Sequence, residues 1–212
     1  MFFLIKNMFL CNQERKNYMK NELLTQPLIC ITNRKLCQES FLNRIENVAK
    51  SKPKAIILRE KDLSESEYEK LAIKVEPICD MYGVPLIYHN HPKLAIANNK
   101  GLHMPLSALE KVSRADRQKI KILGASCHST EDAAKAIRLG CTYIIAGHIY
   151  DTDCKKGIPG RGTDFLKSLC EHVHIPVYAI GGITPSKMPE IISCGAAGGC
   201  LMSGYMQGEI LK

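Results

Sequence analysis

The chain alternates short apolar runs, rich in β-branched residues, with segments whose apolar residues recur at helical spacing, and this alternation constrains the fold most. Eight such runs lie at 28–32, 55–58, 85–88, 101–104, 122–126, 142–146, 176–180 and 198–202. Helical spacing fills most of the intervals, at 41–48, 68–81, 94–96, 133–137, 165–169 and 188–192. Eight strands alternating with helices predict an α/β fold, a (β/α)8 TIM barrel. An open doubly wound sheet is the main alternative, but it usually needs fewer strands, and no GxGxxG follows the first run.

Residues that cap helices support these boundaries. Ser64 and Ser129 precede acidic residues at the start of helical segments, and Thr163 precedes an aspartate in the same way. Gly140 and Gly195 follow helical segments, where glycine commonly ends a helix. Few residues remain after the last apolar run, so we expect a truncated last helix.

We expect a single domain, because 212 residues is a common length for an α/β barrel. The barrel should occupy 26–212 and follow an N-terminal extension at 1–25. The extension begins MFFLIKNMFLC, which is broken by Lys6 and Asn7 and followed by charged residues, whereas a secretory signal places its charge before the apolar run. No apolar run in the sequence is long enough to span a membrane, so we expect no membrane partner.

The charge distribution and the cysteine spacing limit which partners and which cell compartment we expect for the protein. The formal net charge is +8, but Lys and Arg are spread along the chain without a long basic run. This distribution is typical of a solvated surface, so we expect no nucleic-acid partner. The ten cysteines form no CxxC pair and no zinc-finger spacing. We interpret them as reduced, mostly buried thiols of a cytoplasmic protein, and homo-oligomerisation stays open.

The segment 124–162 carries the richest chemistry, and it reads strand, helix, strand and polar loop: GASCHSTEDAAKAIRLGCTYIIAGHIYDTDCKKGIPGRG. Ligands of parallel α/β folds bind at the carboxyl ends of strands, where His128 and the loop residue Lys155 fall. His128 is a candidate general acid/base, with a capping or buried histidine as the alternative. Ser126 is a candidate donor to a substrate, or a helix cap. Cys127 is interpreted as a core residue rather than a nucleophile.

Two consecutive strand ends have the features of a phosphate site. Gly181, Gly182 and Ile183 follow the seventh strand, and Met202 and Ser203 follow the eighth. In barrels these loops often bind phosphate through backbone N–H groups, and glycine allows the backbone to approach closely. Tight turns alone would also explain the glycines, but two such ends in succession favour phosphate binding.

Other polar residues are expected at the same rim. Arg59 and Lys61 end the second strand and can neutralise a carboxylate or phosphate, or form surface ion pairs. Histidines near the ends of the third, fourth and sixth strands are His89, His91, His103 and His148. Several histidines at one rim can bind metal, but these come from separate loops and no carboxylate accompanies them after the third and fourth strands. We therefore predict no metal site, and whether these histidines line the site stays open.

The sequence resembles the thiamine-phosphate synthase/TenI family over nearly everything after Pro27. The matching segments are ILREK at 57–61, GASCHSTEDA at 124–133, AGHIYDTDCKKG at 146–157, IPVYAIGGITP at 175–185 and the MSGYM near the end. The resemblance implies a (β/α)8 barrel with one of two activities. The synthase joins a hydroxymethylpyrimidine diphosphate to a thiazole phosphate with Mg²⁺ and releases pyrophosphate. The TenI-like tautomerase aromatises a thiazole carboxylate phosphate by moving a proton, without metal.

Departures from the synthase pattern favour the tautomerase. After the third strand the synthase carries a sequence close to VNDR, whose Asp binds Mg²⁺, whereas this chain has YHNH with Asn90 at that position. After the fourth strand the synthase carries HLGQ and then acidic residues, whereas this chain has HMPLSA from His103 onward. Mg²⁺ is usually held by one or two carboxylates beside substrate phosphates. We therefore expect no cofactor, and Mg²⁺ only if the synthase alternative holds.

The loop GHIYDTDCKKGIPGRG is very similar to the TenI version, and it has His148 where synthases tend to carry Pro. The TenI catalytic histidine corresponds to His128. The resemblance thus implies a TenI-like thiazole tautomerase of thiamine biosynthesis, an isomerase whose small-molecule substrate is a thiazole phosphate. Its carboxylate would meet Arg59, Lys61 or Lys155. The alternatives are a thiamine-phosphate synthase, a transferase, with altered Mg²⁺-binding residues, and a non-catalytic regulatory protein that binds a thiazole phosphate.

Removal of residues 1–18 tests the expected domain boundary. Because the fold should begin near Pro27, the shortened chain should stay soluble and keep the thermal unfolding midpoint and activity of the full chain. Thermal denaturation followed by circular dichroism checks the midpoint. Aggregation of the shortened chain would contradict the boundary.

Overall fold

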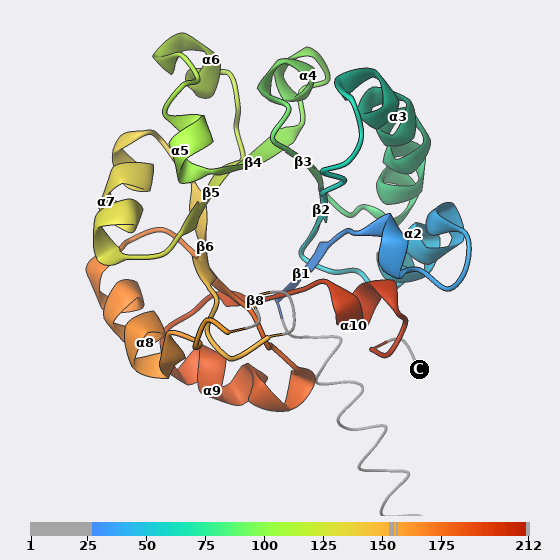
Figure 1. Ribbon diagram of the computed structural model, residues 1–212. Coiled ribbons are helices and arrows are strands. Elements are labelled where there is room, and N and C mark those ends of the chain that lie inside the picture. Colours follow the sequence, from blue (N-terminus) through green and yellow to red (C-terminus); the bar gives the residue numbers. More distant parts are fainter. Residues whose placement is uncertain (1–26, 153–154, 156, 211–212) are drawn as a thin grey trace, which may run out of the picture.

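The computed structural model describes residues 27–152, 155 and 157–210. Eight parallel strands form a closed barrel in sequence order, in which β8 (Gly198–Leu201) pairs with β1 (Leu28–Ile31). The helices surround the barrel in a ring (Figure 1). The predicted (β/α)8 TIM barrel is confirmed. The predicted extension 1–25 lies outside the described residues, so the domain boundary stays a prediction.

The elements follow the sequence pattern closely. The remaining strands are β2 (Ala55–Leu58), β3 (Leu86–His89), β4 (Gly101–Pro105), β5 (Leu123–Cys127), β6 (Tyr143–Gly147) and β7 (Val177–Ile180). The α-helices are α2 (Phe41–Lys50), α3 (Glu65–Tyr82), α4 (Pro92–Ala97), α5 (Leu106–Leu109), α6 (Arg114–Gln118), α7 (Thr130–Arg138), α8 (Gly162–His172), α9 (Met188–Ser193) and α10 (Ser203–Met206). The 3₁₀ helices η1 (Arg34–Leu36) and η3 (Pro185–Lys187) lie in loops.

All eight predicted strands are present, and each end differs from the prediction by at most one residue. The sequence did not predict α5 and α6, because helices of four and five residues are too short to show a helical period. The truncated last helix is confirmed by α10, which has four residues.

Two of the predicted caps are confirmed and one is wrong. Ser64 forms a capping box with Glu67, and the Ser129 side chain accepts a hydrogen bond from the Asp132 backbone. Thr163 does not cap α8, because the helix already begins at the preceding residue and Arg161 occupies its N-cap position.

Side chains alternate across each strand and so build two separate cores. The inner core fills the barrel and consists mainly of Ile29, Ile31, Ala55, Ile57, Ile87, Tyr143, Ile145, Tyr178 and Cys200. The outer core lies between strands and helices, where strand residues such as Ile56 and Ile144 join helix residues such as Val75 and Leu166 in one buried cluster. Burying each such side chain contributes roughly 1.5–3 kcal/mol, so most of the stability comes from these two layers.

Glycines allow close contacts at two places inside the barrel. A Cβ on Gly124 of β5 would lie 2.1 Å from Cζ of Tyr143, so only glycine lets this tyrosine ring cross the barrel interior beside β5. A Cβ on Gly198 would lie 1.9 Å from the Pro27 carbonyl oxygen, at the start of the β1–β8 pairing that closes the sheet.

Among the described residues, no helix has the length and hydropathy needed to cross a membrane.

A double-mutant cycle tests the contact between Gly124 and Tyr143. Gly124→Ala should destabilise the protein by about 1–3 kcal/mol, because the added methyl group overlaps the ring. In a Tyr143→Leu background the same change should cost clearly less, since the overlapping ring atoms are gone. Urea denaturation of the four chains measures the coupling. Equal costs in both backgrounds would show that the ring does not set the requirement for glycine.

Candidate active site at the carboxyl ends of the strands

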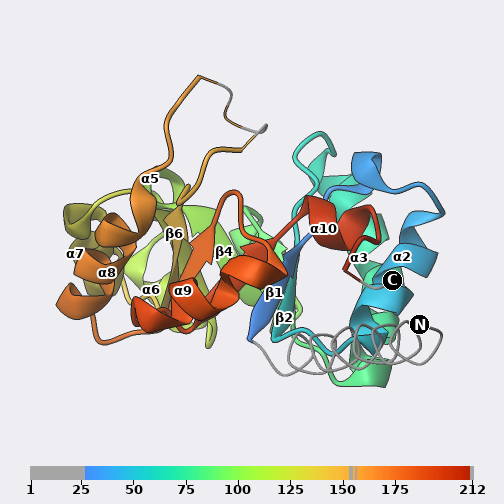
Figure 2. The same ribbon diagram turned by 90° about the horizontal axis from the view of Figure 1, so that it is seen from below.

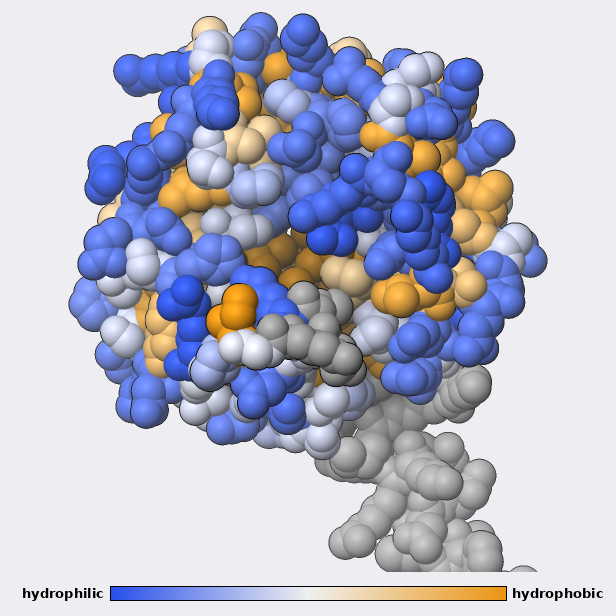
Figure 3. Space-filling view, in the orientation of Figure 1, coloured by the Kyte–Doolittle hydropathy of each residue, from blue (hydrophilic) through white to orange (hydrophobic). Residues whose placement is uncertain are grey.

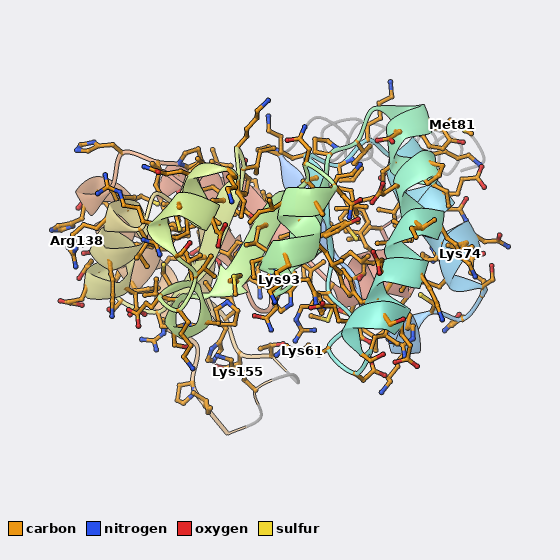
Figure 4. All side chains as sticks on the ribbon, turned by 90° about the horizontal axis from the view of Figure 1, so that it is seen from above. Lys61, Lys74, Met81, Lys93, Arg138 and Lys155 are labelled. Atoms are coloured by element: carbon orange, nitrogen blue, oxygen red, sulfur yellow. The ribbon has the colours of Figure 1, made fainter. Side chains whose placement is uncertain are left out.

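The closed parallel barrel brings the predicted site residues to one end of the molecule. The described parts of the loop between β6 and α8 project from this end, on the same side as α10 (Figure 2). Lys61 and Lys155 both lie at this end, whereas Met81, near the end of α3, lies at the opposite one (Figure 4). A hollow opens near the centre of this face, with hydrophilic residues around much of its edge (Figure 3). Ligands bind at this end of TIM barrels, so it is the candidate site.

His128 lies directly after β5, and its imidazole is held by the neighbouring strand. Its Nδ1 lies 2.6 Å from the Gly147 carbonyl oxygen at the end of β6. A carbonyl oxygen only accepts, so Nδ1 carries the proton and Nε2 of the neutral ring keeps its lone pair. The residue is exposed, and among the described residues Nε2 has no hydrogen-bond partner. The imidazole is thus neither buried nor a helix cap, and its Nε2 is available to a substrate.

Ser126 lies one layer deeper in the barrel and is bonded to a buried histidine. Its Oγ is 3.0 Å from Nε2 of His103, and Nδ1 of His103 is 3.1 Å from the Tyr143 hydroxyl. Burial lowers the pKa of His103 to about 3, helped by the nearby His89. The His103 imidazole is therefore neutral at physiological pH, and Ser126 is not a helix cap, since its hydroxyl bonds across the barrel.

The histidines at the end of β3 and directly after it lie beside these groups. The His89 ring stacks near the His103 ring, with centroids 6.3 Å apart. Burial, Arg59 and Lys61 together lower the pKa of His89 to about 4, so this imidazole is also neutral. His91 lies 4.1 Å from the Tyr68 ring and 3.7 Å from a Glu65 carboxylate oxygen, which ties it to α3. His89 and His103 therefore form the floor of the site, whereas His91 packs against a helix.

Arg59 and Lys61 end β2 on either side of a buried carboxylate. Glu60 is 3% exposed and accepts hydrogen bonds from the Thr32 hydroxyl at 2.7 Å and from the Arg34 guanidinium at 3.0 Å. The Arg34 backbone N–H donates to the same carboxylate. Glu60 is therefore satisfied by Thr32, which follows β1, and by Arg34 of η1, and it is not free for a ligand. Arg59 lowers the pKa of Lys61, as expected for two adjacent cations.

The predicted phosphate-binding segments follow β7 and β8. Gly181 and Gly182 have φ values of +96° and +63°, and a Cβ on Gly182 would lie 2.7 Å from the Asp151 carbonyl oxygen. The Lys187 ammonium donates to the Gly182 carbonyl at 2.9 Å. Among the described residues, no acceptor bonds the backbone N–H groups of Gly182, Ile183, Met202 and Ser203. Unpaired N–H groups on adjacent strand ends suit an anionic ligand.

A cavity of about 650 Å³ lies between the β6–α8 loop and the β7 end, within the range of small-ligand pockets. It is lined by Asp151, Thr152, Lys155, Gly157, Ile158, Pro159 and Gly182. Of the predicted site residues it brings together Lys155 and Gly182, whereas His128, Ser126, Arg59 and Lys61 are not in its lining. His148 lies beneath the loop, buried to 6% exposure, where its Nε2 donates to the Ile158 carbonyl at 3.1 Å.

The chemistry of the remaining groups narrows the possible reactions. Burial raises the pKa of Cys127 to about 12, with Asp132 and Cys141 adding to the shift, so this thiol is not a nucleophile. Within the described part of the chain, no three His, Cys, Asp or Glu residues are grouped to hold a metal ion. The ends of β3 and β4 offer imidazoles and the amide of Asn90, which do not fit Mg²⁺, a cation that is usually held by carboxylate oxygens.

Three contributions to this site were missed from the sequence. Tyr143 looked like an ordinary strand residue, and the glycine opposite it on β5 is the signal that could have revealed its inward ring. Glu60, between the predicted cations Arg59 and Lys61, was assigned no role from the sequence, yet it is buried. Tyr150 connects the β6 loop to α9 through a 2.6 Å hydrogen bond to Glu190, and it lies under the Lys187 ammonium.

Glu60→Ala tests the support of the β2 end. Removing this buried carboxylate leaves the Thr32 hydroxyl and the Arg34 groups unpaired, so the free energy of unfolding should fall by about 3 kcal/mol. Asp62→Ala is the matched control, because Asp62 also pairs with Arg34 but at the exposed surface, and it should cost much less. Chemical denaturation measures both. Equal losses would show that burial of Glu60 does not matter.

Comparison with known proteins agrees with this architecture. Residues 28–205 match the family model described as thiamine monophosphate synthase. The chain is 34% identical over 192 residues to thiamine-phosphate synthase 2 of Streptococcus pneumoniae, covering 87% of this chain and 90% of that protein. It is also 34% identical to thiamine-phosphate synthase of Clostridium acetobutylicum, covering 92% of each.

A solved structure gives the same result. Thiamine phosphate pyrophosphorylase from Pyrococcus furiosus superposes with a TM-score of 0.73 at 26% identity, over 88% of this chain and 90% of the other. The names of these relatives agree with the synthase alternative rather than with an isomerase. The resemblance seen in the sequence is confirmed at the level of the family, and the chain belongs to the thiamine monophosphate synthase (TMP-TENI) family of thiamine biosynthesis.

Proposed function

We propose that this member of the family is a thiazole tautomerase, which aromatises a thiazole carboxylate phosphate by moving one proton. The observation that supports this proposal most directly is the geometry of His128. The Gly147 carbonyl holds its Nδ1–H, so Nε2 is the atom that takes the proton from the ring carbon and returns it to the exocyclic carbon. The proton count balances, because the same proton leaves and returns and no redox partner is needed.

The surrounding groups suit the charges of such a substrate. The unpaired N–H groups after β7 and β8 would bind its phosphate, at the position where barrels commonly bind phosphate. Arg59, Lys61 or Lys155 would neutralise its carboxylate. The imidazoles of His89 and His103 are neutral. The floor of the site therefore carries no negative charge that would compete with the substrate carboxylate for these cations.

A second candidate is favoured by the names of the relatives, which are thiamine-phosphate synthases at 34% identity. That reaction joins two phosphorylated precursors and uses Mg²⁺ beside a diphosphate. The groups at the ends of β3 and β4 do not fit Mg²⁺, and Glu60, the buried carboxylate at the end of β2, is already bonded to Thr32 and Arg34. We therefore place the tautomerase first and the synthase second.

Replacement of His128 by Asn tests the proposal. Loss of the acid/base group should lower kcat for aromatisation by about 10²–10⁴-fold. Binding of the aromatic thiazole phosphate should change little, because the phosphate and carboxylate contacts remain. A spectrophotometric assay of ring aromatisation measures the rate, and calorimetry measures the binding.

The matched control is His172→Asn. His172 also has Nδ1 at 2.6 Å from a carbonyl oxygen, that of Ser168, but it lies at the end of α8, away from the carboxyl ends of the strands. This variant should keep the wild-type rate. A wild-type rate in His128→Asn would remove the residue from the reaction.

A further inference from the structure

We propose that His103 is a positioning residue that commits the Ser126 hydroxyl to donate a hydrogen bond to the substrate. The chain of contacts runs from Tyr143 on β6, across Gly124 on β5, to His103 on β4, and back to Ser126 on β5. The inference rests on the proposed function for the identity of the substrate group that Ser126 meets.

The buried Tyr143 hydroxyl determines which group donates and which accepts in each of these hydrogen bonds. The Tyr143 hydroxyl is buried in the barrel, with its residue 5% exposed, and within the described part of the chain Nδ1 of His103 is its sole hydrogen-bond partner. If Nδ1 carried a proton, the tyrosine would accept and its own O–H would stay unpaired in an apolar interior, which is unfavourable. The tyrosine therefore donates to Nδ1 at 3.1 Å.

The tautomer of the histidine follows from this donation. The His103 imidazole is neutral, because burial lowers its pKa to about 3, so only one of its nitrogens carries a proton. With Nδ1 accepting from the tyrosine, that proton is on Nε2, and Nε2–H donates to Ser126 Oγ at 3.0 Å. The serine oxygen accepts from below, so its own proton is free to point toward the mouth of the barrel.

A fixed donor at this place selects an acceptor on the substrate. Ser126 points into the barrel, and His128 follows it on the same strand end after the outward Cys127. The carboxylate attached to the ring is an anion before and after His128 removes the ring proton, so a preorganised donor binds it throughout the reaction. The geometry thus assigns Ser126 O–H to the substrate carboxylate, with His103 and Tyr143 holding its direction.

Two measurements on the full-length chain test this inference. In the ligand-free protein, ¹⁵N NMR of labelled histidine should show His103 protonated at Nε2 and unprotonated at Nδ1. Tyr143→Phe should remove this tautomer preference and raise KM for the dihydrothiazole carboxylate phosphate about 3–10-fold, with a smaller change in kcat. Ser126→Ala should weaken binding by a similar factor, and Tyr143→Phe should add nothing in that background.

Tyr178→Phe is the matched control. Tyr178 also points into the barrel, and the centroid of its ring lies 6.1 Å from that of Tyr143. In the described structure its hydroxyl takes no part in the hydrogen bonds among Tyr143, His103 and Ser126. It should leave the tautomer and KM unchanged. A wild-type His103 protonated at Nδ1, or an undiminished effect of Tyr143→Phe in the Ser126→Ala background, would overturn the inference. If wild-type protein fails to bind the thiazole compound, the proposed function is wrong. The NMR result still determines which nitrogen of His103 carries the proton.

Discussion

The candidate site depends on one constraint, the parallel pairing of β8 with β1 that closes the sheet. In a closed barrel of parallel strands, every strand ends on the same face, so residues far apart in sequence must lie around one opening. His128 after β5, the glycines after β7 and the cations after β2 lie on the same face of the barrel for this reason. Gly198 permits the pairing, since a side chain there would collide with the Pro27 carbonyl.

Groups on β6 determine which ring nitrogen carries the proton in His128 and in His103. The Gly147 carbonyl on β6 fixes the proton of His128 on Nδ1, and the Tyr143 hydroxyl on the same strand fixes that of His103 on Nε2. One imidazole is exposed with a free lone pair, while the other is buried and neutral. Two histidines on neighbouring strands therefore serve different purposes because their surroundings differ.

The sequence was sufficient for the fold, and it placed the candidate site at the carboxyl ends of the strands. Eight apolar runs that alternate with helical segments predict buried parallel strands, so β1 to β8 and the place of His128 after β5 could be predicted from the sequence alone. The partners of side chains could not be placed. Whether Glu60 faces solvent or Arg34, and whether the Tyr143 ring turns inward, depends on packing between segments distant in sequence. The short helices α5 and α6 carry too few residues to show a period.

The names of the relatives favour the synthase, whereas our proposal is the tautomerase, and an assay of the wild-type protein with both substrate sets separates the two reactions. One reaction contains the dihydrothiazole carboxylate phosphate with a chelator and no added Mg²⁺. The other contains the hydroxymethylpyrimidine diphosphate, the thiazole phosphate and Mg²⁺. The proposal predicts rapid aromatisation in the first and no thiamine phosphate above background in the second. Enzymatic formation of thiamine phosphate without any catalysed aromatisation would contradict it.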